Sequence, residues 1–321
     1  MYIRDWLLIL KRKPKLKEKR MPISNRELKI FLDCFWGGIN NKEYIFNNYI
    51  LFKILKEINK NVSLVDKIEE ADIVFVSVFA KFDKNQHKLK HKDVPVVSIL
   101  YEAYNWPWYF YNNHFNADFS FSFDDNSDKN CNLSGLTSLK SERFNSMEEY
   151  FHWIDDTLNK NKTKSTENKN LACSVISARS MFRDPLFLCA ANFFKDKMKN
   201  GGTLFNNIGS KIKHKETLLD NSLFNFCPEN CISKNYITEK IIDSYICGCV
   251  PIYSGSKDVF KIFNEKSMIY LDLGNFDNFS KVTTESFLKY KEENILINKD
   301  YYKIMYSNIK DLLTKILTKV L

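Results

Sequence analysis

The chain has 321 residues, which is enough for two domains or for one large domain. Its hydrophobic content of 44%, with many phenylalanines and tyrosines, is typical of a packed globular protein and excludes a disordered one. The formal net charge is +9, but residues 1–20 hold eight Lys or Arg against two acids, so the rest of the chain carries only +3 and does not show the charge pattern of a nucleic-acid-binding protein.

Residues 1–20 form a basic N-terminal segment with a short apolar run at residues 6–10. The run is much too short to span a bilayer, and its charges follow it, which is the reverse of a secretory signal. Two interpretations stay open: attraction to an anionic membrane surface, or a basic terminus that is disordered or packed. Without a secretion signal we expect reduced thiols and a cytoplasmic location, either free or peripheral on the inner face of a membrane.

Residues 21–158 alternate between strand-like and helix-like patterns, which predicts an α/β domain of Rossmann-like type. The run at 73–79 is continuously apolar, as in a buried parallel strand. A helix is predicted at 44–58, and the other strands are expected at 28–35, 62–65, 94–100 and 117–123.

Three residues follow the strand at 94–100 closely: Glu102, Trp106 and Trp108. The carboxyl end of a strand is where open α/β sheets place functional groups, although a carboxylate in a surface loop is the alternative for Glu102. The aromatic side chains could form a platform for a sugar or fill a local core. Asp124 follows the next predicted strand in the same way.

Residues 159–170 are polar and charged, and we interpret them as an interdomain linker. Residues 171–298 form a second α/β domain, with a helix at 182–198 that has Arg183 near its start. Residues 299–321 form an amphipathic helix. This helix is expected to pack back across both domains, with a peripheral membrane helix as the alternative.

The most informative stretch runs from residue 224 to 255. An apolar strand ends at Pro228, a polar loop follows, and helical spacing begins at Thr238 and ends near Gly248, before a strand at 250–253. In a parallel sheet this order places the helix start at the ligand-binding edge, where free N–H groups suit a phosphate. Lys240 lies in the first helical turn, next to Glu239.

No metal site is predicted. Four cysteines at 227, 231, 247 and 249 have spacings that match no usual zinc ribbon. His87 and His91 have one-turn spacing but no third ligand in view, and no Asp-x-Asp pair occurs in the chain.

The stretch contains Glu229-Asn230, then Tyr236-Ile-Thr-Glu-Lys240, Gly248, Pro251-Ile-Tyr253 and Gly255. This pattern resembles the donor-binding motif of the α-1,3/1,4-fucosyltransferases, and the resemblance covers roughly residues 28–290. It implies an inverting, GDP-fucose-dependent enzyme of the GT-B type, with two Rossmann-like domains facing across a cleft and a closing C-terminal helix. An ordinary βαβ unit of another doubly wound protein is the alternative.

The resemblance also implies roles for single residues. Glu102 corresponds to the general base, although Tyr-Glu-Ala stands where the family usually has Gly-Glu-Asn, and the family's Arg-x-Pro element is missing. Trp106, Trp108 and Asp124 would contact the acceptor, a glycan hydroxyl, which we expect to belong to GlcNAc in an N-acetyllactosamine-type unit receiving an α-1,3 linkage. No cofactor is expected to be required, and a divalent cation would at most stimulate. The donor would be bound by Arg183, Asn230, Tyr236, Glu239 and Lys240.

Three hypotheses from different classes follow. A GDP-fucose-dependent fucosyltransferase is preferred. A GT-B transferase that uses another nucleotide sugar is second, and a non-enzymatic binder of nucleotides or nucleic acid is third. Donor competition would separate the first two, and salt-dependent DNA or RNA binding without turnover would identify the third.

Overall fold

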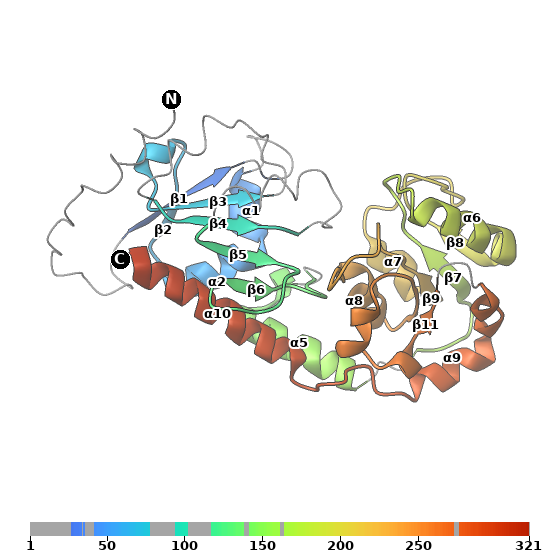
Figure 1. Cartoon of the computed structure of the whole chain (residues 1–321). Coiled ribbons are helices and arrows are strands. Elements are labelled where there is room, and N and C mark those ends of the chain that lie inside the picture. Colours follow the sequence, from blue (N-terminus) through green and yellow to red (C-terminus); the bar gives the residue numbers. More distant parts are fainter. Residues whose placement is uncertain are drawn as a thin grey trace, which may run out of the picture.

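The structure is a computed structural model that describes residues 27–33, 35, 42–77, 94–101, 117–137, 141–160, 164–272 and 276–320. Within these ranges the chain forms two parallel β-sheets with helices around them (Figure 1). The α/β prediction is therefore confirmed. Residues 1–26, with the basic segment, lie outside the described residues, as do Glu102, Trp106 and Trp108.

The first sheet has six parallel strands in the order β2-β1-β3-β4-β5-β6. Every residue of β3 is buried, as expected from its continuous apolar run. The strands are β1 (Leu28–Asp33), β2 (Val62–Leu64), β3 (Ile73–Ser77), β4 (Val96–Ile99), β5 (Phe119–Ser122) and β6 (Asn130–Asn132). The helices of this half are α1 (Lys42–Asn48), α2 (Ile50–Ile58), α5 (Met147–Asn159) and α10 (Tyr301–Val320).

The second sheet has five parallel strands in the order β11-β10-β9-β7-β8. Its strands are β7 (Asn170–Ser174), β8 (Met198–Asn200), β9 (Ser222–Phe226), β10 (Val250–Tyr253) and β11 (Ile269–Tyr270), and its helices are α6 (Arg183–Phe194), α7 (Lys215–Asp220), α8 (Glu239–Ile246) and α9 (Thr284–Lys291). Short 3₁₀ turns occur across the two halves at Ile68–Glu70, Ser141–Arg143, Lys195–Lys197, Lys257–Lys261, Glu265–Ser267 and Asp277–Lys281.

Two of the predicted helices differ from the structure. The helix expected at 44–58 is divided into α1 and α2 by Tyr49, whose backbone is extended (ψ 134°). The helix expected at 182–198 ends at Phe194, because Lys195 takes a left-handed φ of 51°. The chain then turns into β8, a short edge strand that the helical pattern concealed.

Both sheets reverse their strand order at one point, and in the second sheet this point lies between β7 and β9. The chain leaves β7 for β8 on one side and then crosses to β9 on the other, so the loops after β7 and β9 diverge over the carboxyl edge of the sheet. Ligands of open α/β sheets bind in the crevice that such a switch point creates. Residues 175–182 and 227–238 form these two loops.

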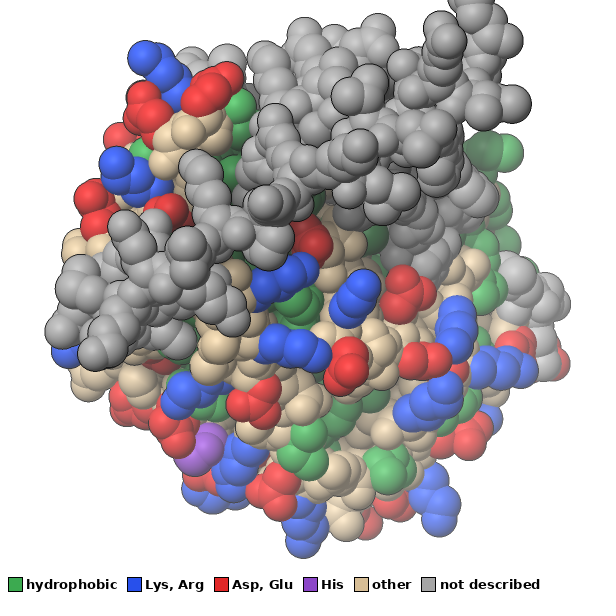
Figure 2. All heavy atoms as spheres, turned by 60° about the vertical axis from the view of Figure 1, so that its left-hand side comes forward, with side chains coloured by type: hydrophobic (Ala, Val, Ile, Leu, Met, Phe, Trp, Pro, Cys, Tyr) green, Lys and Arg blue, Asp and Glu red, His purple; other side chains and the backbone are tan. Residues whose placement is uncertain are grey.

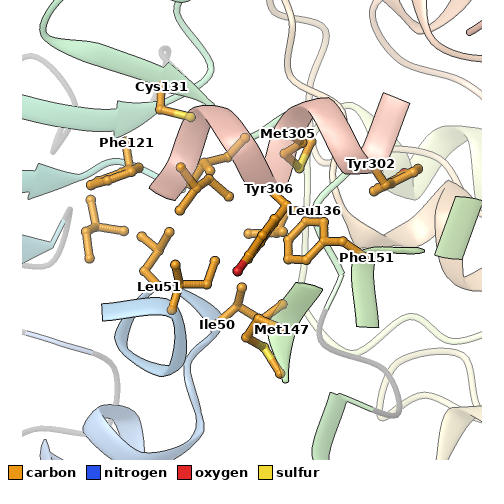
Figure 3. Close-up of a cluster of buried hydrophobic side chains, with 14 of the residues drawn as sticks. Ile50, Leu51, Phe121, Cys131, Leu136, Met147, Phe151, Tyr302, Met305 and Tyr306 are labelled. Carbon is orange, nitrogen blue, oxygen red and sulfur yellow. The ribbon is translucent and has the colours of Figure 1, made fainter. Parts of the chain in front are cut away.

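Helix α10 packs along the first domain beside α5 and α2 (Figures 1 and 3). Its apolar face is completely buried at Tyr302, Ile309, Leu313, Ile316 and Leu317. The helix start is fixed by Asp155 of α5, whose carboxylate accepts the Tyr302 N–H at 2.9 Å and the Lys303 N–H at 2.8 Å. The helix therefore packs mainly along the first domain, rather than across both domains as expected, and its apolar face is occupied by protein.

Within the described ranges, the helices are too short or too polar to cross a bilayer.

The two domains are joined by hydrogen bonds between the loop after β6 and the donor-motif loop. Gly135 N–H donates to the Ile237 carbonyl at 2.7 Å, and the Ser134 hydroxyl donates to the Asn235 carbonyl at 2.7 Å. The Thr137 hydroxyl reaches the Asp243 carboxylate of α8 at 2.6 Å. Helix α8 thus contributes to the domain interface as well as to its own sheet.

The segment interpreted as the linker, residues 159–170, begins in the last residue of α5 and ends in the first residue of β7. One lysine holds it against the second domain. The Lys164 ammonium donates to the carbonyls of Leu219 (2.7 Å), Ser222 (2.6 Å) and Cys247 (3.1 Å). The segment is thus attached to the second domain by the hydrogen bonds of a lysine, although its sequence contains no apolar side chain.

Candidate active site

A cavity of about 180 Å³ opens at the carboxyl edge of the second sheet, beside the switch point. It lies under the loops that follow β7 and β9 and against the start of α8. Its wall combines apolar residues with three cations and two acids: Val175, Ile176, Arg183, Lys215, Leu219, Asn225, Phe226, Cys227, Pro228, Glu239, Lys240 and Asp243.

Arg183 is the first residue of α6, and only 5% of it is exposed. Its guanidinium donates to the Asn230 side-chain oxygen at 2.5 Å and to the Ala178 carbonyl. The Nε–H has no hydrogen-bond partner in the part of the chain that the structure describes. Burial lowers the pKa of Arg183, although the nearby acids Asp184 and Glu229 oppose that shift.

This environment is unusual for a buried cation, since neutral oxygens supply both hydrogen bonds. Buried charges are normally paired, and an unused buried donor calls for an explanation. The neighbouring Arg179 behaves differently, because its exposed guanidinium forms an ion pair with Asp184 at 3.2 Å. Arg183 is therefore the arginine that is suited to an anionic ligand.

Lys240 lies in the first turn of α8, and its side chain is 22% exposed. Its ammonium forms an ion pair with the Glu229 carboxylate at 2.8 Å and donates to the Thr238 hydroxyl at 2.8 Å. Burial alone would lower the pKa of Lys240, but the charges of Glu229 and Glu239 raise it above its ordinary value. The lysine thus stays charged at the cavity wall.

Glu239 is half-buried beside Lys240 and also lines the cavity. Burial would raise the pKa of its carboxyl, but the charges of Lys240 and Lys215 hold that pKa below its ordinary value. The carboxylate is therefore ionised at neutral pH. An ionised carboxylate is an acceptor for hydroxyl groups.

Lys215 was not foreseen as a residue of this site. It begins α7, and its ammonium forms an ion pair with the buried carboxylate of Asp243 on α8. Asp243 is also the residue that accepts the interdomain hydrogen bond from Thr137. The sequence carried no signal for Lys215, because α7 is a single short helix outside the quoted motif.

Two of the residues predicted to bind the sugar donor, Asn230 and Tyr236, do not line this cavity. Asn230 is held as a partner of Arg183 and, through its carbonyl, of the Ser180 hydroxyl at 2.6 Å. Tyr236 is buried in an aromatic cluster with Phe123 and Tyr101 rather than in the cavity wall; its ring centroid lies 5.0 Å from that of Phe123. Their roles as donor ligands stay predictions.

On the acceptor side only Asp124 lies among the described residues. It is exposed, and its backbone N–H donates to the Ser122 hydroxyl at 3.0 Å. The next residue, Asp125, crosses to the second domain, where it accepts from Lys234 at 2.6 Å and from the Asn235 side chain at 2.8 Å. The roles predicted for Glu102, Trp106, Trp108 and Asp124 remain predictions.

The described residues contain no group of three or more His, Cys, Asp or Glu side chains arranged to hold a metal ion. The seven described cysteines are free thiols. Cys247 and Cys249 pack with Cys173 in a small apolar cluster, apart from Cys227 and Cys231. The positively charged side chains described at the cavity wall are those of Arg183, Lys215 and Lys240.

Known proteins resemble this chain in sequence and in fold. Residues 197–305 match the family model of the glycosyltransferase family 10 (fucosyltransferase) C-terminal region. An alpha-(1,3)-fucosyltransferase, FucT, from Helicobacter pylori is 42% identical over 83 residues, which are 26% of this chain and 17% of that protein. The resemblance to the fucosyltransferases is confirmed. The aligned part spans about a sixth of the length of that curated relative.

The fucosyltransferase-like fold extends over nearly the whole chain. A crystal structure of an alpha1,3-fucosyltransferase matches with a TM-score of 0.69 and 25% identity, covering 94% of this chain and 93% of the other. An alpha1,3-fucosyltransferase with GDP matches with a TM-score of 0.68 and 23% identity, covering 96% and 94%. The predicted GT-B arrangement, two parallel-sheet domains with a C-terminal helix, is confirmed.

Proposed function

We propose that this chain transfers L-fucose from GDP-fucose to a hydroxyl group of an acceptor glycan, with inversion at the anomeric carbon. The observation that carries the proposal is Arg183: a buried guanidinium at the wall of a cavity at the switch point, whose hydrogen bonds within the described residues go to neutral oxygens. A guanidinium offers a planar fork that suits phosphate oxygens.

Related proteins support the choice of donor. The family model matched by residues 197–305 is that of fucosyltransferases. Solved structures of similar fold are alpha1,3-fucosyltransferases with GDP and with GDP-fucose. The motif that led to the prediction, from Glu229 to Gly255, lies within the matched region and contributes Glu239, Lys240 and Asp243 to the wall of the cavity described above.

The chemistry needs a stabilised leaving group. As the bond from fucose to GDP breaks, negative charge develops on the diphosphate, and fixed cations can stabilise it without reorganisation. Arg183, Lys240 and the N-terminus of α8 would provide this charge. No metal would then be required, and a divalent cation would assist only the release of GDP.

The acceptor would be activated from the first domain. In an inverting transfer, a base removes the proton of the acceptor hydroxyl on the face opposite GDP. We assign this role to Glu102, which follows β4 in the sequence, and contacts with the acceptor to Trp106, Trp108 and Asp124. Glu239 would bind hydroxyl groups of the ribose or of fucose. We propose GlcNAc in an N-acetyllactosamine-type unit as the acceptor, and an α-1,3 linkage.

We also propose a cytoplasmic location, with the basic residues 1–20 mediating contact with the inner face of a membrane. Their clustered charge supports this. Removing residues 1–23 should lower binding to anionic vesicles while turnover on soluble acceptors is kept; unchanged vesicle binding would contradict it.

A second candidate is a GT-B transferase that uses another nucleotide sugar. It is favoured by one observation: Arg183, Lys240 and Glu239 line the cavity, and such side chains suit the diphosphate and hydroxyl groups of any nucleoside-diphosphate sugar. A nucleic-acid binder has less support. On the face drawn in Figure 2, the described Lys and Arg side chains are interspersed with Asp and Glu and form no continuous basic area.

The test is turnover with a panel of donors. The chain would be incubated with N-acetyllactosamine and GDP-fucose, GDP-mannose, UDP-galactose or UDP-N-acetylglucosamine, and nucleotide release and product mass would be measured. The proposal expects a fucosylated product with GDP-fucose alone, also in excess chelator. A product with another donor would favour the second candidate, and loss of turnover in chelator that manganese restores would overturn the metal-independent mechanism.

A further inference from the structure

Glu229 is a completely buried carboxylate at the start of the loop after β9. Its oxygens accept the Thr238 N–H at 2.8 Å, the Thr238 hydroxyl at 2.8 Å and the Lys240 ammonium at 2.8 Å. The Tyr253 hydroxyl donates to it at 3.4 Å. The carboxylate is therefore saturated by protein donors and has no surface left for a ligand.

The surrounding chain is shaped to admit this side chain. The Glu229 N–H donates to the Ser254 carbonyl at 2.8 Å, which ties the loop after β9 to the end of β10. A Cβ atom at Gly255 would lie 2.9 Å from Glu229 Cγ and 2.6 Å from the Tyr253 hydroxyl. A side chain at 255 would collide with Tyr253 and with Glu229, so glycine fits this position.

We propose that Glu229 is a positioning residue for Lys240, which it orients toward the diphosphate of the nucleotide sugar. The inference rests on the proposed function. A lysine ammonium has three N–H donors on a flexible stem. Glu229 takes one of them and the Thr238 hydroxyl takes a second. Among the residues that the structure describes, one donor is then left for the cavity that Lys240 lines.

The opposite role would be competition, in which Glu229 withholds Lys240 from the nucleotide. The geometry favours positioning, because Thr238 holds the same carboxylate and the same ammonium from the start of α8. The three groups form a closed triangle at the start of α8, so the ammonium is held at the positive end of the helix dipole.

The experiment measures GDP affinity by isothermal titration calorimetry for Glu229→Gln, Lys240→Met and the double variant. The temperature is one at which circular dichroism shows each protein folded. Each single change should weaken GDP binding by about tenfold or more, because the ammonium is lost or no longer held. The double variant should bind GDP no more weakly than Lys240→Met alone, since Glu229 acts only through this lysine.

Lys215→Met is the matched control, because Lys215 lines the same cavity but pairs with Asp243. The factors by which Lys215→Met and Glu229→Gln weaken GDP binding should multiply in the variant that carries both changes. If Glu229→Gln acted through a general loss of structure, its effect on GDP affinity would instead depend on both Lys215 and Lys240. If Glu229→Gln does not fold, Thr238→Val gives the same test with a smaller loss, since it removes a hydroxyl that touches both members of the pair.

GDP affinity that is unchanged or tighter in Glu229→Gln would overturn the inference. It would also be overturned if Glu229→Gln weakened GDP binding by the same factor in the wild type and in Lys240→Met. Wild-type protein that does not bind GDP would instead overturn the proposed function, and this inference with it.

Discussion

At the scale of single residues, the pair formed by Lys240 and Glu229 determines how changes at this site must be interpreted. Removing the lysine leaves a carboxylate that is completely buried without its cation. Breaking a buried ion pair by removing one partner is strongly destabilising. Any loss of activity in a Lys240 variant therefore combines lost binding with lost stability.

We expect Lys240→Met to lower the free energy of unfolding by about 3–5 kcal/mol, and Glu229→Gln to restore much of this loss in the double variant. Urea denaturation of the protein without nucleotide measures both. Lys289→Met, which breaks an exposed pair with Glu285, should change the stability by less than about 1 kcal/mol. A Lys240 variant as stable as the wild type would contradict the buried pair.

The free energy of unfolding should depend on pH through the ionisation of Asp258. Burial acts to raise its pKa, but the Lys261 ammonium, the Asn235 N–H and the Ser256 hydroxyl outweigh it and lower the pKa to about 2. Because the folded-state pKa lies below the unfolded one, the contribution is present above about pH 4 and is lost as pH falls toward 2. It amounts to about 2 kcal/mol.

In Asp258→Asn this part of the acid destabilisation should disappear. Urea unfolding at a series of pH values between 2 and 6 provides the measurement. Identical pH profiles for the variant and the wild type would show that the aspartate contributes nothing in this range.

Glu102 carries the proposed proton transfer. Glu102→Gln keeps the size and polarity of the side chain but cannot accept a proton, so turnover should fall by roughly 10²–10⁴-fold. Affinity for GDP-fucose should change little, because the residue belongs to the acceptor side. Steady-state rates together with donor calorimetry test this, and a near-normal rate would move the base to Asp124 or Asp125.

Some of these residues could be found in the sequence and others could not. Glu239 and Lys240 stand at a helix start, where the change from strand to helix period is visible, and Arg183 was found through the family resemblance. The Glu229 pairing was hidden because its partners follow 9 and 11 residues later, beyond a loop. The Lys215–Asp243 pair joins two helices that no local pattern connects.

At the scale of elements, the buried strands were the most predictable part. β3, β4 and β9 are short, largely apolar runs whose residues are all buried, so the sequence pattern reveals them. The edge strands β6 and β8 were missed, because they are three residues long and partly polar. Such strands are defined by hydrogen bonds to a neighbour rather than by their own sequence.

Helix α10 offers a direct test of element packing. Ile316 is completely buried among α2, α5 and the first sheet, whereas Ile304 on the same helix is 46% exposed. Ile316→Ala should lower the free energy of unfolding by about 2–5 kcal/mol, as expected for a truncated core side chain. Ile304→Ala is the matched control and should have a much smaller effect in urea denaturation. Equal effects would contradict the packing of α10 on the first domain.

At the scale of the whole molecule, α8 connects the cavity with the domain interface. Its first turn carries Glu239 and Lys240, and Asp243, one turn later, accepts from Thr137 of the first domain. Ile241, Ile242 and Tyr245 of the same helix belong to the large core that also contains residues of α5 and α10. A change in α8 at the cavity would therefore also affect residues of this helix that contact the first domain.

The central claim is that the cavity at the switch point binds the diphosphate of GDP through Arg183. Isothermal titration calorimetry with GDP tests it most directly, for wild type, Arg183→Met and the exposed control Arg179→Met. We expect Arg183→Met to lose about 2–5 kcal/mol of binding free energy and Arg179→Met to bind like the wild type. Equal GDP affinity in wild type and Arg183→Met would contradict it.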